Sequence, residues 1–173
     1  MPGIGARPAA ARDLPAVAAL VRAGFEAHVA TRDCDEAGRA AFRSLATAVA
    51  IARRLGAGAV ARVAVETGPG RETVVGYGEL RGRDHDPGGV DHLAFLFTAP
   101  DRLRRGIGGR VLAGLAAAAR ARRPGLDSLT VNASSYAVPA YERLGFRATG
   151  PRTTRDGIAF TPMRLDLPPA SEG

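Results

Sequence analysis

The stretch that decides the fold lies at residues 97–110 and reads FTAPDRLRRGIGGR. An apolar strand end comes first, and a short basic turn follows Pro100. Glycines then precede an apolar helix that we expect from Arg110 to Ala121. This order places bare backbone N–H groups and arginine side chains at a helix N-terminus, where phosphate binds well. The sequence therefore predicts a site for a phosphate-bearing cofactor.

Composition limits the class of protein. The chain has 173 residues and one cysteine, Cys34, which excludes an internal disulfide and a multi-cysteine zinc site. All 24 lysine-or-arginine positions are arginine, so a lysine nucleophile is impossible. The sequence has no apolar run of about 18 residues that would span a membrane, and residues 1–12 lack the apolar core of a secretory signal. We expect a cytoplasmic protein without a membrane partner.

The formal net charge of +7 raises nucleic acid as a partner. The arginines are scattered, however, and aromatic residues make up only 5% of the chain. Nucleic acid is therefore not the expected partner. A basic nucleic-acid-binding domain stays as a rival hypothesis, and its binding would weaken steeply with salt.

Helical and strand patterns alternate along the chain. Apolar spacing predicts a helix from an N-cap at Asp13 to about His28, and further helical structure over Thr31–Leu55. A short helix is expected within Ser134–Leu144, and Gly145 suits its C-terminal end. The expected strands are Ile4–Arg7, Ala59–Glu66, Glu72–Arg81, Val90–Thr98, Leu126–Ala133, Phe146–Gly150 and Ile158–Leu167. The order of these elements indicates a mixed α/β sheet domain.

A second motif at residues 136–146 reads YAVPAYERLGF. Together with the Arg104–Arg110 loop and the order of the elements, it makes the chain resemble a GCN5-related N-acetyltransferase from Ile4 to about Leu167. The usual loop of that family is Gln/Arg-x-x-Gly-x-Gly/Ala. Here the loop begins with Leu103, a departure that affects one side-chain contact and leaves the backbone cradle intact.

The resemblance implies an α/β fold with a mixed, largely antiparallel sheet of six to seven strands, flanked by four helices. It implies a single domain over residues 1–167, with a flexible tail at 168–173. The implied activity is transfer of an acetyl group from acetyl-CoA to a primary amine, here that of a small molecule, within a ternary complex and without a metal. The alternatives are acetylation of a protein N-terminus or lysine, and a non-catalytic acyl-CoA-binding sensor. A homodimer is also suggested.

The expected cofactor contacts follow the glycine loop. Backbone N–H groups and side chains of the loop are expected to bind the pyrophosphate, and its glycines let phosphate oxygens come close. The residues are Arg104, Arg105, Gly106, Ile107, Gly108 and Gly109. By resemblance, Phe97 and Thr98 pair their backbone with the pantetheine arm, where an N–H group contacts the acetyl oxygen. The strand Leu126–Ala133 splays away to admit the arm. Asn132 either hydrogen-bonds the cofactor or caps the turn after its strand.

Tyr141 matches the tyrosine that protonates the leaving thiolate in many members of the family. A phenol with a pKa near 10 stays protonated at pH 7 and can donate to a sulfur whose thiol pKa is about 8.5. The alternative is that Tyr141 only packs with Leu144 and Phe146 against the sheet.

The general base is less well specified by the sequence. A substrate ammonium must lose a proton before it attacks the thioester. Glu79, on the strand beside the central one, is the first candidate and would act through water, and Asp91 and His92 are the next. The amine can also react from its neutral fraction without a dedicated base.

The acceptor side is expected near His28 and Cys34, and near the loop of Arg152, Arg155 and Asp156. These loop residues either bind a carboxylate of the substrate or form a solvated turn. Metal binding by His28, Cys34 and a neighbouring aspartate would lack a second ligand cluster, so no metal is expected.

Overall fold

The computed structural model describes residues 3–83, 86 and 88–169. Residues 170–173 of the expected tail lie outside this description. The helices and strands follow in the order β1 (Ile4–Pro8), α1 (Leu14–His28), α2 (Glu36–Leu45), α3 (Ala48–Gly56), β2 (Val60–Gly68), β3 (Arg71–Arg81), β4 (His92–Thr98), α4 (Ile107–Arg122), β5 (Ser128–Ala133), α5 (Val138–Arg143), β6 (Arg147–Ala148), β7 (Thr153–Arg155) and β8 (Ile158–Asp166).

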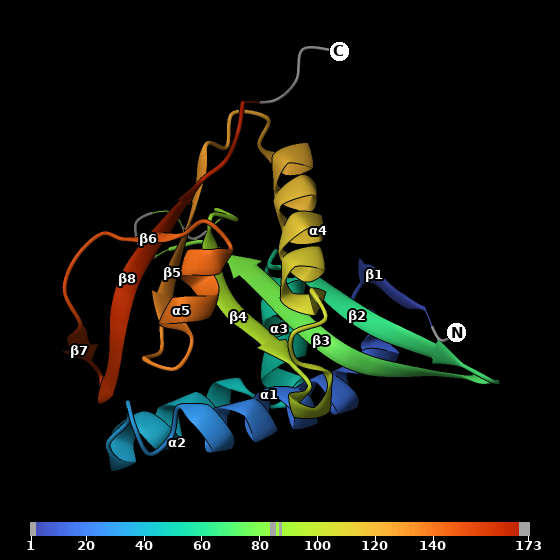
Figure 1. Cartoon of the computed structure of the whole chain (residues 1–173), viewed down its shortest axis with the longest axis horizontal. Coiled ribbons are helices and arrows are strands. Elements are labelled where there is room, and N and C mark those ends of the chain that lie inside the picture. The colour runs from blue at the N-terminus through green and yellow to red at the C-terminus, as the bar shows by residue number, and fades with distance from the viewer. Residues whose placement is uncertain (1–2, 84–85, 87, 170–173) are drawn as a thin grey trace.

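The described strands form one sheet in the order β1-β2-β3-β4-β5-β8-β6, and β7 pairs with β8 beside this path. Every pair is antiparallel except β4 with β5. In Figure 1, β2 and β3 extend to the right and β8 stands on the left, with the parallel pair between them. The expected mixed, largely antiparallel sheet is thereby confirmed.

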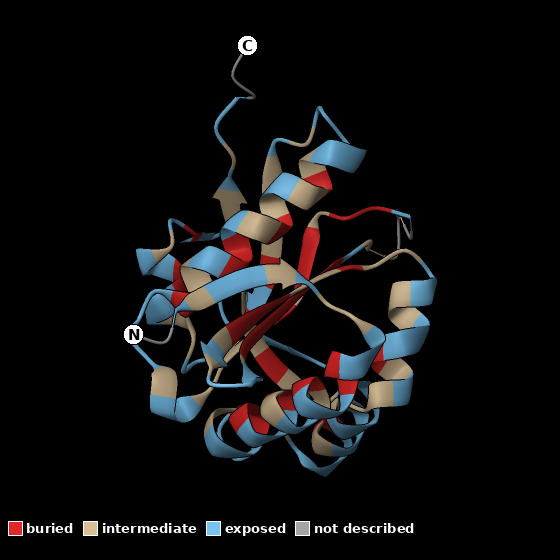
Figure 2. Cartoon of the chain, turned by 90° about the vertical axis from the view of Figure 1, so that its right-hand side faces the viewer, coloured by how far each residue is buried: buried red, intermediate tan, exposed pale blue. Residues whose placement is uncertain are grey.

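Apolar residues divide between the two faces of the sheet with the strand period of two. Val63 and Val65 join a core with α1 and α3, whereas Ala64 joins a core with α4 and α5. Figure 2 shows the buried residues along the strands, between helices on either side. The sheet is therefore covered by α4 and α5 on one face and by the first helices on the other.

Two glycines of β3 let α4 approach the sheet closely. A Cβ atom at Gly76 would lie 2.7 Å from Ile107, and one at Gly78 would lie 2.7 Å from both Val111 and Leu115. Such distances are shorter than real Cβ contacts, so the packing of α4 depends on glycine at both positions. This contact fixes α4 with its N-terminus beside the end of β4.

The counts of helices and strands differ from the expectation. Within the described residues there are five α-helices rather than four, because Thr31–Leu55 contains α2 and α3. The hydroxyl of Thr47 accepts a hydrogen bond from the Ala50 amide at 3.1 Å and starts α3 as a separate helix. The described sheet also has eight strands rather than six or seven, because exposed Thr153–Arg155 pairs with β8.

Candidate active site

The two parallel strands at the centre of the sheet separate soon after they pair. Among the described residues, β4 and β5 pair only through His92 with Thr130 and Leu93 with Val131. The rest of β4 and Asn132 of β5 border a cavity of about 480 Å³. The expected divergence of β5 from its neighbour is thereby confirmed.

A β-bulge in β4 faces this cavity. Leu93 pairs with Leu80 and Phe95 pairs with Glu79, so Ala94 stands outside the register between β3 and β4. Bulges are common beside active sites because they redirect the local backbone. Ala94 lines the cavity, which makes the backbone at the bulge a candidate contact for a ligand.

The loop after β4 enters α4 through two residues in the left-handed region. Arg104 has a φ of 64°, and Gly106, the N-cap of α4, has a φ of 72°. Left-handed loop residues are typical of anion-binding nests, and a strained non-glycine residue of this kind occurs often at ligand sites. The helix begins at Ile107 rather than at the expected Arg110. The amides of residues 107–109 therefore have no acceptor within α4.

Glycine leaves the start of α4 open toward the cavity. Gly108 lines the cavity, and the nearest atom to a Cβ there would be the Thr98 hydroxyl oxygen, 3.9 Å away. A Cβ at Gly106 would have nothing within 4 Å, and at Gly109 the nearest atom would lie 3.6 Å away. Ile107, by contrast, is 2% exposed and packs in the core, so it can offer only its backbone at this end.

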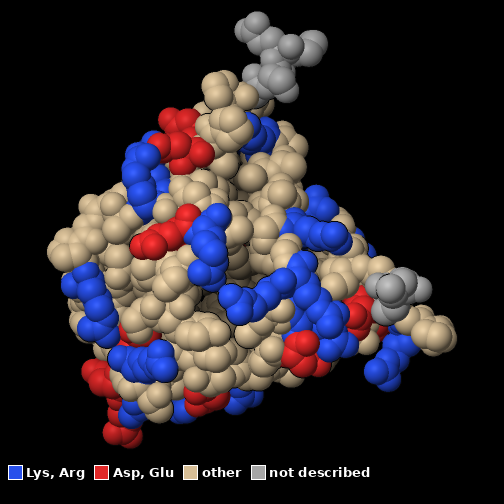
Figure 3. All heavy atoms as spheres, viewed as in Figure 1, with Lys and Arg blue, Asp and Glu red and all other residues tan. Residues whose placement is uncertain are grey.

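Arginine side chains gather near this end of α4. Arg102 and Arg105 contact Glu66 of β2 at 2.7 and 3.7 Å. Arg104 is exposed and forms no ion pair with a described residue. Figure 3, a view of the face that carries α4 and α5, shows basic side chains around a hollow near its middle. The structure thus brings positive charge and open backbone amides together, as the loop motif predicts, and cofactor binding there stays a prediction.

The other expected cofactor contacts border the same cavity. Phe97 and Thr98 end β4, and exposed Asn132 lies on β5 across the opening. The Phe97 ring packs tightly against α1, because a Cβ at Gly24 would lie 2.5 Å from it. The three residues therefore flank the gap into which the pantetheine arm is expected to fit.

Tyr141 reaches the cavity from α5. The residue is 7% exposed, and its ring meets the Phe146 ring edge-on at 5.1 Å between centroids. Burial raises the pKa of the phenol well above its usual value, so the hydroxyl stays protonated at neutral pH. No described residue shares a hydrogen bond with this hydroxyl, which leaves it available to a ligand. Packing and proton donation are both compatible with this position.

Glu79 lies outside the lining of the cavity. Its side chain is 0% exposed and accepts hydrogen bonds from Arg54 at 2.6 and 3.1 Å and from the Tyr77 hydroxyl at 2.6 Å. The Arg54 guanidinium in turn lies 4.9 Å from the centroid of Phe95, whose ring borders the cavity. The structure therefore places Glu79 one layer behind the cavity wall, and its role as a base stays a prediction.

Breaking this buried ion pair is expected to destabilise the fold. Arg54→Met leaves the Glu79 carboxylate buried without its cation, and such a change lowers the free energy of unfolding by about 3–5 kcal/mol. Arg54→Met/Glu79→Gln removes both charges and is expected to recover most of the loss. Urea denaturation followed by circular dichroism measures both effects. If Arg54→Met were as stable as the parent, a stabilising role of the Arg54–Glu79 ion pair would be contradicted.

His92 lies where β4 and β5 part, and it lines the cavity. It is 8% exposed, with Nδ1 2.9 Å from the Thr130 hydroxyl oxygen. Burial lowers the pKa of the imidazole to about 4, and positive charge adds to the effect, from Arg81, Arg83 and Arg155. His92 is therefore neutral at pH 7 and only a weak base.

The lowered pKa of His92 makes the stability of the fold depend on pH. The folded-state pKa of His92 lies below the usual value of 6.5. The contribution of this group to the free energy of unfolding is therefore complete above pH 6.5 and is lost as the pH falls toward 4. In that window the free energy of unfolding is expected to fall by about 1.4 kcal/mol per pH unit from this group. His92→Gln should flatten the decline in urea denaturation at a series of pH values. The same decline in parent and variant would be incompatible with this shift.

Loops on the acceptor side are held by a buried carboxylate. The Asp33 side chain is 0% exposed and accepts from the Ser135 hydroxyl at 3.0 Å and from Arg152 at 3.1 Å. Arg152 is therefore engaged by Asp33, whereas Arg155 and Asp156 line the cavity. The sequence predicts these three arginine and aspartate positions as a group, and the structure separates Arg152 from the other two.

Metal binding and nucleophilic chemistry find little support around Cys34. Burial raises the pKa of its thiol, so the thiolate is disfavoured. Within the described ranges, no three His, Cys, Asp or Glu side chains gather in a position to hold a metal ion.

No described helix is both long and apolar enough to cross a bilayer.

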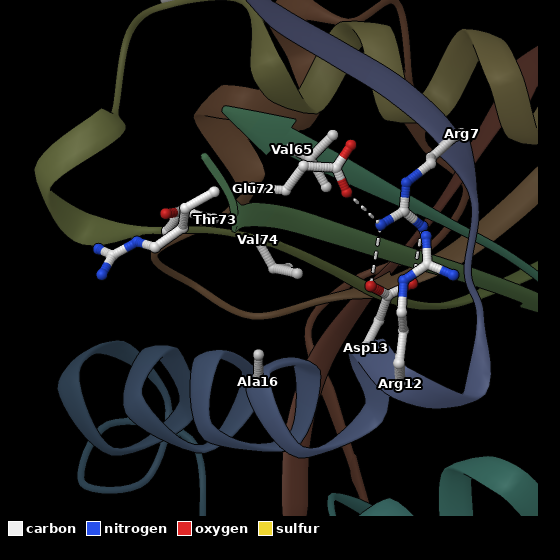
Figure 4. A pocket seen from close by; sticks show the side chains of 9 residues that line it. Arg7, Arg12, Asp13, Ala16, Val65, Glu72, Thr73 and Val74 are labelled. Carbon is white, nitrogen blue, oxygen red and sulfur yellow. Dashed lines mark hydrogen bonds and ion pairs between the residues drawn. The ribbon is translucent and has the colours of Figure 1, made fainter. Parts of the chain in front are cut away.

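A second cavity, of about 410 Å³, lies away from the glycine loop, between α1 and the hairpin of β2 and β3. Figure 4 shows Arg7 between Asp13 and Glu72, which it contacts at 2.8 and 3.0 Å. Hydrogen bonding to Asp13 is the main cause that raises the pKa of Arg7. These contacts tie β1 to α1 and β3, which gives this cavity a structural role.

Some residues of the larger cavity were not expected from the sequence. Tyr136 stacks on His28 with centroids 3.8 Å apart and planes 3° from parallel, which joins α1 to the segment before α5. Arg81 also lines the cavity, from the end of β3. Tyr136 opens the motif at residues 136–146, but no local pattern predicts its stacking on His28 or the place of Arg81 at the cavity, because each depends on contacts between distant segments.

The model of the acetyltransferase (GNAT) domain family matches residues 30–167. No match was found among curated proteins. Among solved structures, one titled a GCN5-related N-acetyltransferase, class-II aminotransferase, from Rhodopseudomonas palustris is 27% identical, with a TM-score of 0.69 and 96% of each chain covered.

Two other similar structures contain coenzyme A. The PaiA N-acetyltransferase from Thermoplasma acidophilum, in complex with coenzyme A, is 15% identical with a TM-score of 0.71, covering 95% of this chain and 99% of that one. N-acetylglutamate synthase from Neisseria gonorrhoeae, with coenzyme A and N-acetyl-glutamate, is 18% identical with a TM-score of 0.63, covering 95% of this chain and 35% of that one. At these identities the likeness concerns the fold. Because the family model spans most of the sequence, this chain belongs to the GNAT acetyltransferase family.

Proposed function

We propose that this protein transfers an acetyl group from acetyl-CoA to the primary amine of a small molecule, directly within a ternary complex. One observation carries the proposal: the gap between β4 and β5 meets the open N-terminus of α4 and the hydroxyl of Tyr141 in one cavity. The coenzyme A bound to two similar proteins supports the choice of donor.

The cofactor would lie along the opening of the sheet. Its diphosphate accepts hydrogen bonds from the amides of residues 107–109, and the charge of Arg104 adds attraction. The pantetheine arm runs between β4 and β5, against the backbone of Phe97 and Thr98 and beside Asn132. This arrangement holds the thioester carbon near the acceptor nitrogen, which lowers the entropic part of the barrier.

The transfer needs no covalent enzyme intermediate. The neutral amine attacks the thioester carbonyl and a C–N bond forms. The nitrogen then loses a proton to water, and the C–S bond breaks. A backbone N–H group holds the oxygen that becomes negative, either at the strand end or at the Ala94 bulge. Tyr141 donates its proton to the leaving thiolate and recovers one from water.

The proton of the substrate ammonium goes to water in this scheme. Glu79 can take part only through water or the Tyr77 hydroxyl, because Arg54 and Tyr77 occupy its carboxylate. The low pKa of His92 makes it a poor acceptor at pH 7. The geometry therefore favours reaction from the neutral fraction of the amine, and a change of kcat in Glu79→Gln without loss of stability would support Glu79 instead.

Release of free CoA from acetyl-CoA, measured with a thiol reagent over a panel of amines, tests the proposed function. Calorimetric binding of CoA is measured beside it. Binding with amine-dependent release is the expected result. Binding without release from any amine or peptide would favour the acyl-CoA sensor, release only with peptides would favour a protein acetyltransferase, and failure to bind CoA would overturn the proposal.

A further inference from the structure

Two arginine side chains line the acceptor side of the cavity. Its charged lining consists of Arg81 at the end of β3, Arg155 at the end of β7, and Asp156 in the following turn. Among the described residues, neither guanidinium forms an ion pair with a carboxylate. The neighbouring Arg83, by contrast, is bound to Asp91 at 2.8 Å. Two cations thus face a space that a ligand can occupy.

Both arginines act on the same part of the cavity. The charges of Arg81 and Arg155 both reach His92, which lines the cavity and is neutral at pH 7. Asp91 contributes the opposite sign but is already paired with Arg83. The potential around His92 is therefore positive, and a low-dielectric wall strengthens its attraction for an anion.

The Arg155 side chain lies over an aromatic ring at the cavity. Its guanidinium lies 5.5 Å from the centroid of Phe160, which also lines the cavity. The turn after Arg155 is held against α2, because a Cβ at Gly38 would lie 2.1 Å from the Gly157 carbonyl oxygen. The Asp35 amide also donates to that carbonyl at 3.0 Å. The turn is thus anchored with its cation at the cavity.

An apolar wall completes the acceptor side. The Phe42 ring stacks on Phe25 at 3.9 Å and meets Phe95 edge-on at 5.6 Å. Phe42 and Phe95 both line the cavity, whose 480 Å³ also has to hold the pantetheine arm. The space that is left suits a small molecule with an apolar part rather than an extended polycation.

We infer that the acceptor is an amine that also carries a carboxylate, an amino-acid-like molecule whose carboxylate lies between Arg81 and Arg155. Its apolar part rests against Phe42 and Phe95, and its ammonium first meets Asp156, the carboxylate of the lining. The inference rests on the proposed function, since it names the substrate class of the same site. A guanidinium recognises a carboxylate through charge-assisted and often bidentate hydrogen bonds.

Matched acceptors test the inference. The initial rates of CoA release are compared for phenylalanine, phenylalaninamide and phenethylamine, and for leucine, leucinamide and isoamylamine. Expressed per concentration of neutral amine, kcat/KM is expected to be about ten- to a hundredfold higher with the free carboxylate within each set. Equal or higher rates with the amides and the simple amines would overturn the inference and leave the proposed function standing. No CoA release with any amine would overturn both.

Variants assign the effect to the two arginines. Arg81→Gln and Arg155→Gln are each expected to raise KM for the carboxylate acceptor about tenfold or more, with CoA affinity unchanged, and Arg155→Lys should recover part of the loss. Arg53→Gln, an exposed substitution on α3 outside both cavities, serves as the matched control. An unchanged preference for the carboxylate in both glutamine variants would contradict the placement of the carboxylate.

Discussion

Gly108→Val is expected to weaken CoA binding by about a hundredfold or more while the protein still folds. Gly108 lines the cavity, and the nearest atom to its Cβ would be 3.9 Å away, so the helix itself accepts the side chain. The branched side chain would fill the space through which phosphate oxygens reach the amides of α4. Each lost charge-assisted hydrogen bond costs about 1.5–3 kcal/mol, so the loss of two is sufficient for this effect. Calorimetric titration with CoA measures it.

Gly114→Val is the matched control for this variant. It makes the same change in the same helix, and the atoms nearest to its Cβ would belong to the flexible Arg62 side chain, at 3.6 Å. The control is expected to bind CoA like the parent, because it makes the same change from glycine to valine away from the start of the helix. Parent-like CoA affinity in Gly108→Val would contradict phosphate binding by the amides at the start of α4.

Tyr141→Phe is expected to lower turnover by about a hundredfold or more, in the range of general acid catalysis. The substitution keeps the edge-on contact with Phe146, and the lost hydroxyl has no hydrogen-bond partner among the described residues. Stability and CoA affinity should therefore change little. Single-turnover rates of acetyl transfer measure the chemical step without interference from product release.

The pH dependence provides a second readout for Tyr141. Burial raises the pKa of its phenol, so the protonated form persists through the alkaline range and the parent rate should show no loss from its ionisation up to about pH 10. An unchanged single-turnover rate in Tyr141→Phe would leave Tyr141 with a packing role. A fall in rate that only followed a weaker affinity for CoA would point to the same conclusion.

Local signals in the sequence indicate a helix after the glycine loop, but not its first residue. The glycines after Arg105 and the apolar run that follows define a helix start without reference to other segments. The start of α4 at Ile107 rather than Arg110 escaped prediction because glycines disfavour a helix by propensity, whereas the packing of α4 on β3 extends it. Tertiary contact decides such helix ends.

The acceptor end depends on distant contacts that the sequence does not display. Glu79 forms an ion pair with Arg54, which lies on α3, and Arg152 forms one with Asp33. The split of Thr31–Leu55 depends on the Thr47 cap, which lies within an otherwise regular helical pattern. Pairings between separate segments therefore decide which charged residues reach the cavity.

A crystal structure of the protein with bound coenzyme A tests the central claim most directly. We predict diphosphate oxygens within hydrogen-bonding distance of the amides of residues 107–109, and the thiol between β4 and β5 near the Tyr141 hydroxyl. A coenzyme found elsewhere on the protein, or a diphosphate without contact to the start of α4, would contradict it.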